Sequence, residues 1–142
     1  MQARILLFCG AILGAFGVAL AAMGDHLVRG GVDAASYRGF ETAVRYQMFH
    51  ALALLILGVW SWRQPSRLIA AAAVLFLFGT AGFSGGLYAR IVFPHVDVVW
   101  IVPIGGTLLI VGWLVAAAAA FARPMGAGKT SPPDTPHSVS RQ

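Results

Sequence analysis

The stretch that decides the fold of this chain is Phe40-Glu-Thr-Ala-Val-Arg-Tyr-Gln-Met-Phe-His-Ala-Leu-Ala-Leu-Leu-Ile-Leu57. Charged and polar side chains recur as far as His50, whereas residues 51–57 are wholly apolar. Residues four apart in an α-helix share one face, so Thr42, Tyr46 and His50 would form a polar row. The stretch therefore predicts a membrane helix whose first turns carry a polar cluster.

The composition of the whole chain is that of a membrane protein. Of its 142 residues, 58% are hydrophobic and 11% are charged, whereas about a quarter of the residues in soluble domains are charged. Bilayer crossings need about eighteen or more predominantly apolar residues. We predict an all-α integral membrane four-helix bundle in one domain, residues 1–123. Residues 124–142, rich in Gly, Ser, Thr and Pro, are predicted to be a disordered tail.

The apolar runs predict four transmembrane helices, at about residues 5–24, 40–62, 68–92 and 98–122. The first run follows Arg4, and its pattern also fits a cleaved signal peptide, so both alternatives stand at this point. Between the first two helices we expect a polar loop in which Asp33 starts a short interfacial helix that ends at Arg38. Pro65 is expected to end the second helix.

Several small residues are placed where helices could approach closely in lipid. Pairs with one-turn spacing occur in the first and third helices, at Gly10, Gly14, Gly82 and Gly86. They predict helix packing, including self-association of the chain. Near the start of the fourth helix, Pro103, Gly105 and Gly106 predict a kink or a broken first turn.

The net charge of +5 does not indicate a nucleic-acid partner, because the basic residues stand singly at the ends of apolar runs. They are typical of anchors at the surface of a lipid bilayer. With four crossings, both termini lie on one side. That side would hold Arg4, Arg63, Arg67, Arg123, Lys129 and Arg141, against Arg29, Arg38, Arg45 and Arg90 on the other. This bias predicts a multi-pass protein with both termini in the cytoplasm.

Two further motifs are excluded. Gly126-Ala-Gly-Lys-Thr130 resembles the end of a phosphate-binding loop, but Arg123 stands where the first glycine of that loop is required, so no nucleotide is expected. Cys9 is the single cysteine and lies inside the first apolar run, which rules out a disulfide within one chain.

The polar residues near the first loop form the candidate functional site, because the first helix should exit and the second should enter at the same, non-cytoplasmic, face. The candidate cluster comprises Asp25, His26, Glu41, Arg45, Tyr46, Gln47, His50, Ser84 and Tyr88. It could be a structural network, a proton or small-solute pathway, or a metal or haem site with His26 and His50 as ligands. We expect no cofactor and no catalytic residue, because no nucleophile, base and orienting group occur at a recognisable spacing.

Four stretches, taken in order along the chain, together resemble one protein family. They are Ala19-Leu-Ala-Ala-Met-Gly-Asp-His26, Thr42-Ala-Val-Arg-Tyr-Gln-Met-Phe-His-Ala-Leu-Ala-Leu54, Gly79-Thr-Ala-Gly-Phe-Ser-Gly-Gly-Leu-Tyr88, and Pro103-Ile-Gly-Gly-Thr107 with Gly112-Trp113. The family is that of the small YgdD-like bacterial inner-membrane proteins, catalogued as domain of unknown function 423. Its animal relatives are small mitochondrial proteins of the transmembrane protein 256 type.

This resemblance implies a four-helix inner-membrane protein whose first helix is retained. It also implies that characteristic family positions are occupied by Gly24, His26, Tyr46, Gln47, His50, Ser84, Gly85, Tyr88, Pro103, Gly105 and Gly106. The family tends to have Phe-Gly-Ala-His where this chain has Met23-Gly-Asp-His26, so an extra carboxylate stands beside the histidine. The family carries no established activity. The leading expectation is a non-enzymatic accessory or assembly subunit, as a homo-oligomer or in a larger membrane complex.

Overall fold

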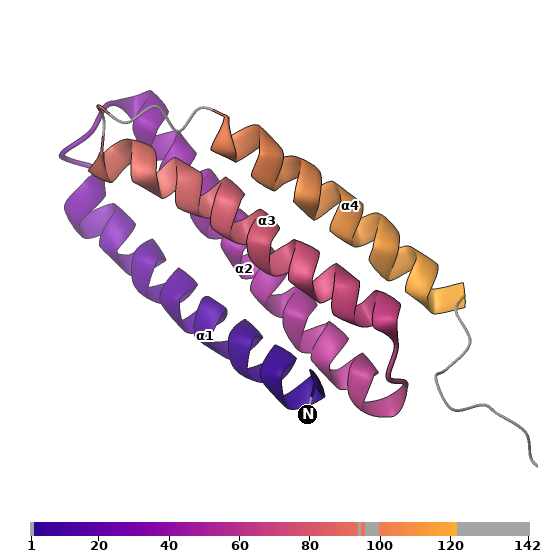
Figure 1. Ribbon diagram of the computed structural model, residues 1–142. Coiled ribbons are helices and arrows are strands. Elements are labelled where there is room, and N and C mark those ends of the chain that lie inside the picture. Colours follow the sequence, from indigo (N-terminus) through magenta and orange to yellow (C-terminus); the bar gives the residue numbers. More distant parts are fainter. Residues whose placement is uncertain (1, 94, 96–99, 122–142) are drawn as a thin grey trace, which may run out of the picture.

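The computed structural model describes residues 2–93, 95 and 100–121, and it is built from four long helices and one short π-helical turn (Figure 1). The elements are α1 (Gln2–Met23), η1 (Gly24–Val28), α2 (Ala34–Arg63), α3 (Arg67–Val92) and α4 (Ile101–Phe121). All four long helices are long and apolar enough to cross a membrane. The predicted all-α four-helix fold is thus confirmed, whereas the predicted tail at 124–142 lies outside the described residues.

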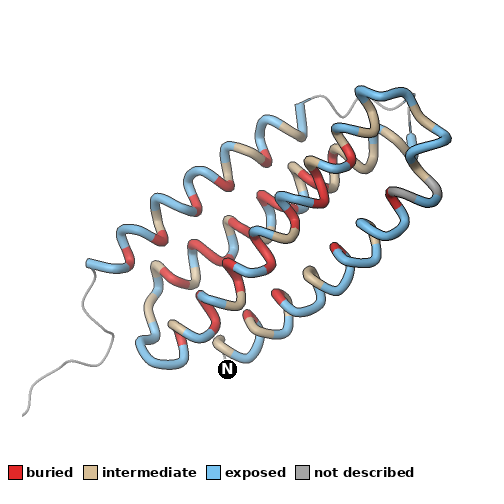
Figure 2. Tube along the Cα trace, turned by 180° about the vertical axis from the view of Figure 1, so that it is seen from behind, coloured by how far each residue is buried: buried red, intermediate tan, exposed pale blue. Residues whose placement is uncertain are grey.

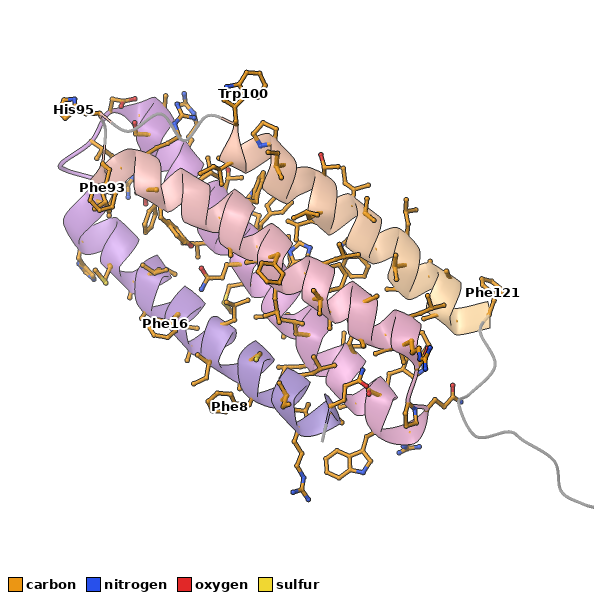
Figure 3. The ribbon with its side chains drawn as sticks, viewed as in Figure 1. Phe8, Phe16, Phe93, His95, Trp100 and Phe121 are labelled. Atoms are coloured by element: carbon orange, nitrogen blue, oxygen red, sulfur yellow. The ribbon has the colours of Figure 1, made fainter. Side chains whose placement is uncertain are left out.

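The helices α2 and α3 form the centre of the bundle. The helix α1 packs on α2, and α4 packs on α3, so α1 and α4 lie on opposite sides of the central pair (Figure 1). The buried positions follow the inner sides of the helices (Figure 2), and the core includes Leu54 and Phe76, both 0% exposed. In contrast, Phe8 and Phe16 on α1 are 67% and 63% exposed and point away from the other helices (Figure 3). An apolar exterior of this kind suits lipid rather than water.

Two predicted boundaries between the first and second helices are wrong. The helix α2 begins at Ala34 rather than near Phe40, so the short interfacial helix expected at Asp33 is the continuous start of α2. The first residues of the expected loop form the π-helical turn η1 instead. The boundaries of α1, α3 and α4 lie within a few residues of the expected ones, although positions 98, 99 and 122 of the fourth predicted helix are outside the described part.

The start of α2 is set by the side chain of Asp33. Its Oδ1 atom accepts hydrogen bonds from the backbone N–H groups of Ala35 (2.8 Å) and Ser36 (3.1 Å), and its other oxygen accepts from the Ser36 hydroxyl. These bonds satisfy N–H groups that have no partner within the helix. The Ser36 hydroxyl, followed by the two backbone N–H groups, lowers the pKa of Asp33 below its ordinary value of 3.8.

We expect Asp33→Ala to speed amide hydrogen exchange several-fold at Ala35 and Ser36, because both N–H groups lose their acceptor. Asp33→Asn is the matched control, since its amide oxygen can still accept. The folded-state pKa is lowered, so the cap is complete at neutral pH and is lost as the pH falls through that pKa. Acidification below about pH 3.8 should therefore expose these amides in the natural chain and leave Asp33→Asn unaffected. Equal exchange in all three proteins at neutral pH would contradict this role.

Glycines bring α3 and α4 into backbone contact. A Cβ atom on Gly105 would lie 2.6 Å from the backbone carbon of Gly82 and would also meet the backbone nitrogen of Phe83. Side chains of α4 cover two neighbouring glycines of α3, with Leu109 over Gly79 and Val102 over Gly86. In α1, a Cβ on Gly10 would lie 2.9 Å from the carbonyl oxygen of Ala51 on α2, and Gly14 faces the same residue. These predicted packing faces are therefore used within the chain.

The first turn of α4 is unbroken, so the predicted break is not observed, and the alternative of a kink stays a prediction. The helix is continuous from Ile101 to Phe121, and Pro103 is its third residue. The first N–H groups of a helix have no partner within it, so a proline in this turn removes no internal hydrogen bond. The carbonyl of Pro103 instead accepts a hydrogen bond from the Thr107 hydroxyl at 2.9 Å.

Candidate functional site

The side chain of Gln47 joins three helices inside the bundle. From its place on α2, Nε2 donates to the carbonyl oxygen of Leu13 on α1 at 2.9 Å. Its Oε1 accepts from the hydroxyl of Tyr88 on α3 at 3.0 Å. Gln47 is 5% exposed. A buried amide is stable in this position because both of its ends are hydrogen-bonded.

A second bond between α2 and α3 lies close by. The Ser84 hydroxyl, on α3, donates to the backbone carbonyl of Ala43 on α2 at 2.8 Å. That carbonyl belongs to a helix, and it can accept this bond because a carbonyl oxygen has two lone pairs. The bonds of Ser84 and Gln47 thus link the same two helices, at two positions that are one turn apart on α2.

The imidazole of His50 connects α2 with α4. Its Nε2 lies 3.2 Å from Nε1 of Trp113, and its Nδ1 lies 2.8 Å from the carbonyl oxygen of Tyr46. Indole N–H only donates and a carbonyl only accepts, so these partners assign the proton to Nδ1 and leave Nε2 as the acceptor. Phe76 packs against the ring at a centroid distance of 5.1 Å. Both nitrogens of the neutral imidazole are therefore engaged.

The side chains of the other predicted cluster members make no hydrogen bond in this network among the described residues. His26 on η1 is exposed, as are Glu41, Arg45 and Tyr46 on α2, although the Tyr46 ring also packs on Phe83. Within the described part of the chain no ion pair links Glu41 with Arg45, and the side chain of Asp25 lies outside the description. The physical reason is rotation about the axis of α2. Its buried stripe runs through Phe40, Ala43, Val44, Gln47, His50, Ala51 and Leu54, and the charged residues fall on the other side.

The two histidines proposed as joint ligands lie at different depths. Gly24, the first residue of η1, packs against Phe40, whose Cε1 would be 2.6 Å from an added Cβ. His50 is ten residues further along α2, which corresponds to about 15 Å of helix. A shared ion needs ligand atoms within about 2–2.6 Å of it. Among the described residues, no group of three or more His, Cys, Asp or Glu side chains is placed to hold a metal.

Two partners in the network were missed from the sequence. Trp113 could have been noticed, because tryptophans in membrane helices usually lie at the interfaces, and an indole N–H within the bilayer needs an acceptor. The carbonyl of Leu13 carries no sequence signal, since every residue has one. Both partners are set by which helices lie side by side.

A groove lies beside the network, between α1 and α3. Its volume is about 290 Å³, and it is lined by Leu13, Phe16, Leu20, Gln47, Leu77, Thr80, Ala81, Ser84, Gly85 and Tyr88. Thr80 is 3% exposed, and its hydroxyl has no hydrogen-bond partner. A Cβ atom added to Gly85 would meet nothing within 4 Å. The groove therefore combines open space at a glycine with an unpaired hydroxyl group.

Comparison with known proteins places the chain among bacterial membrane proteins. The UPF0382 membrane protein of Haemophilus influenzae is 35% identical over 111 residues, which cover 78% of this chain and 89% of that protein. SAB0533 of Staphylococcus aureus is 34% identical, covering 83% and 96%. The Escherichia coli K12 UPF0382 inner membrane protein YgdD is 34% identical, covering 80% and 86%. No solved structure matches the chain at a significant level.

A family match covers most of the four-helix region. The family described as a protein of unknown function (DUF423) matches residues 20–106, from the last turns of α1 into the first turns of α4. The segments that carried the resemblance in the sequence lie within or next to this range. The chain therefore belongs to the DUF423 family of membrane proteins, whose relatives include the UPF0382 inner membrane proteins.

Proposed function

We propose that this chain is a non-catalytic accessory or assembly subunit of a larger inner-membrane complex, and that it holds a transmembrane helix of its partner in the groove between α1 and α3. The observation that carries the proposal is the combination of Gly85 and Thr80 in that groove. The helix α3 has no side chain at Gly85 and an unpaired hydroxyl at Thr80. Both features suit contact with a second helix in lipid.

The glycine at position 85 has no role inside the chain that would explain it. Its neighbours Gly82 and Gly86 are covered by residues of α4, whereas Gly85 faces open space. Glycine in a helix interior costs about 1 kcal/mol relative to alanine. With Ala81 one turn away in the same groove, it would let the backbone of a partner helix approach closely.

The partner in this proposal is a different membrane protein rather than a second copy. The Gly10 and Gly82 faces, which suggested self-association in the sequence, are filled by α2 and α4 of the same chain. A partner helix with small residues and a free backbone carbonyl would fill the groove, and the Thr80 hydroxyl, which is covered as it stands, would turn toward the groove to donate to that carbonyl. An unsatisfied buried hydroxyl costs about 1–3 kcal/mol, which such a bond would relieve.

The hydrogen-bond network supports an accessory role more than a transport or metal-binding role. Gln47, Ser84 and His50 each bind a group on another helix, so they hold the walls of the groove in place. A proton pathway needs groups that can exchange partners, and both nitrogens of His50 are occupied. The same occupancy leaves His50 no free lone pair for a metal.

The orientation belongs to the same proposal. We infer that the termini face the cytoplasm, because the three basic residues 123, 129 and 141 add to Arg4, Arg63 and Arg67 on that side. The opposite end carries Arg29, Arg38, Arg45 and Arg90.

The test uses a photo-activated cross-linker at Ala81, in the groove, and at Ile110, which is 64% exposed on the outer side of α4. After irradiation in native membranes, we expect one dominant membrane protein to be linked from position 81 and not from position 110. The Gly85→Leu substitution should fill the groove and abolish the product while the protein remains folded, because a side chain there meets open space. A product that persists in Gly85→Leu, or one that consists of two copies of this chain, would refute the proposed hetero-complex.

A further inference from the structure

A second cavity lies at the end of the bundle where α1 begins and α2 ends. Its volume is about 500 Å³, and it is lined by Gln2, Ala3, Arg4, Ser61, Trp62 and Pro65. The start of α1 and the end of α2, which line it, lie at the opposite end of the bundle from η1 (Figure 1). Its lining shares no described residue with the groove at Gly85. Of the predicted polar cluster, none of the members whose side chains are described lines it.

The lining of this cavity includes several hydrogen-bond donors. Gln2, Ala3 and Arg4 form the first turn of α1, whose backbone N–H groups have no partner within the helix and carry the positive end of the helix dipole. Arg4 adds a guanidinium group, and among the described residues no acidic side chain lines the cavity. Such a set favours an anion.

Two side-chain atoms at the same cavity lack hydrogen-bond partners. Ser61 is 3% exposed, and its hydroxyl has no hydrogen-bond partner among the described residues. The Nε2 atom of Gln2 is also buried without a partner. Buried polar groups are nearly always paired, so two unpaired groups on one cavity indicate a missing acceptor. Both atoms are covered as they stand, and a small rotation of each side chain toward the cavity would let them donate to one oxyanion.

We propose that this cavity binds the phosphate group of an anionic phospholipid headgroup. Its place at the end of the helices puts the cavity at headgroup level, and Trp62, 63% exposed, carries the kind of ring that settles at that level. Arg63 and Arg67 follow immediately and add positive charge. The phosphate would lie against the first turn of α1, with Arg4 as its ion-pair partner and Ser61 as a neutral donor. This lipid site goes beyond the proposed accessory role and does not depend on it.

The experiment is native mass spectrometry of the delipidated full chain, titrated with phosphatidylglycerol, phosphatidylcholine or inorganic phosphate. We expect phosphatidylglycerol to bind most tightly and Arg4→Gln to weaken that binding about tenfold, the size of one charge-assisted hydrogen bond. Arg63→Gln is the matched control, because it removes the same charge at the same end from a residue that does not line the cavity. An equal loss of phosphatidylglycerol binding in Arg4→Gln and Arg63→Gln would refute the site.

A second variant separates binding from folding. Ser61→Ala removes an unpaired buried hydroxyl, so it should preserve or raise the melting temperature of the lipid-free protein while it weakens phosphatidylglycerol binding. Unchanged lipid binding in Ser61→Ala would contradict the role of this hydroxyl. Saturation by inorganic phosphate without any preference for phosphatidylglycerol would identify a free-phosphate site and overturn the lipid assignment.

Discussion

Replacement of Gly105 by alanine is expected to lower the free energy of unfolding of the bundle by about 1–3 kcal/mol, the usual cost of overpacking a tight contact. The added Cβ would meet three backbone atoms of α3, among them the carbonyl oxygen of Gly79 at 2.9 Å and the backbone carbon of Gly82 at 2.6 Å. Backbone atoms cannot rotate away as a side chain can. The two helices would therefore have to separate, which also loosens the contact between Trp113 and His50.

Gly106→Ala is the matched control for this prediction. It adds the same methyl group to the next residue of the same helix, but the nearest atom would be the side-chain Cδ2 of Phe83 at 3.4 Å. Both variants gain about the same helix propensity, so the difference between them isolates the helix–helix clash. The measurement is reversible unfolding in mixed detergent micelles, followed by the loss of helical circular dichroism. Equal stability of the two variants would show that α3 and α4 do not meet at Gly105.

Gln47→Leu is expected to destabilise the bundle by about 1–2 kcal/mol. The substitution removes the bonds to Leu13 and Tyr88, and hydrogen bonds between membrane helices average about 0.6 kcal/mol each. It also leaves the half-buried hydroxyl of Tyr88 without its acceptor, which adds a desolvation cost. The packing of α1 should be weakened most, since the bond from Gln47 joins the backbone of α1 to α2.

A double-mutant cycle with Tyr88→Phe measures the bond between the two side chains. Tyr88→Phe alone should lower the free energy of unfolding by less than Gln47→Leu does, because it removes one hydrogen bond and leaves the amide bonded to Leu13. In the background of Gln47→Leu, the loss of stability caused by Tyr88→Phe should be about 0.6 kcal/mol smaller than in the natural chain. Strict additivity of the two substitutions would mean that this bond does not contribute to stability.

Much of the fold follows from residues that are close together in the sequence. The apolar runs and the few charges determine four membrane helices, since a bilayer crossing depends on length and hydrophobicity alone. Asp33 was correctly expected to start a helix. The error was to end that helix at Arg38, because nothing local interrupts it and the chain continues as α2.

The candidate site was predictable only in part. Helical spacing put Tyr46 and His50 on one face, and Gln47 next to it, but it could not fix how α2 is rotated against its neighbours. That rotation buries Gln47 and His50 and turns Glu41 and Arg45 outward. It depends on side-chain packing across three helix contacts, which no window of sequence contains.

Residues near one another in the chain are enough to establish that it crosses a membrane with four helices, that polar side chains cluster early in the second, and that small residues permit close packing. Only the tertiary structure decided which polar groups meet: Gln47 with Leu13 and Tyr88, and His50 with Trp113, 63 residues away. Hydrophobicity is a sum over neighbouring residues, so it can be read along the chain. A hydrogen bond between helices requires two distant residues at one depth and one rotation, and those are fixed only when the helices pack.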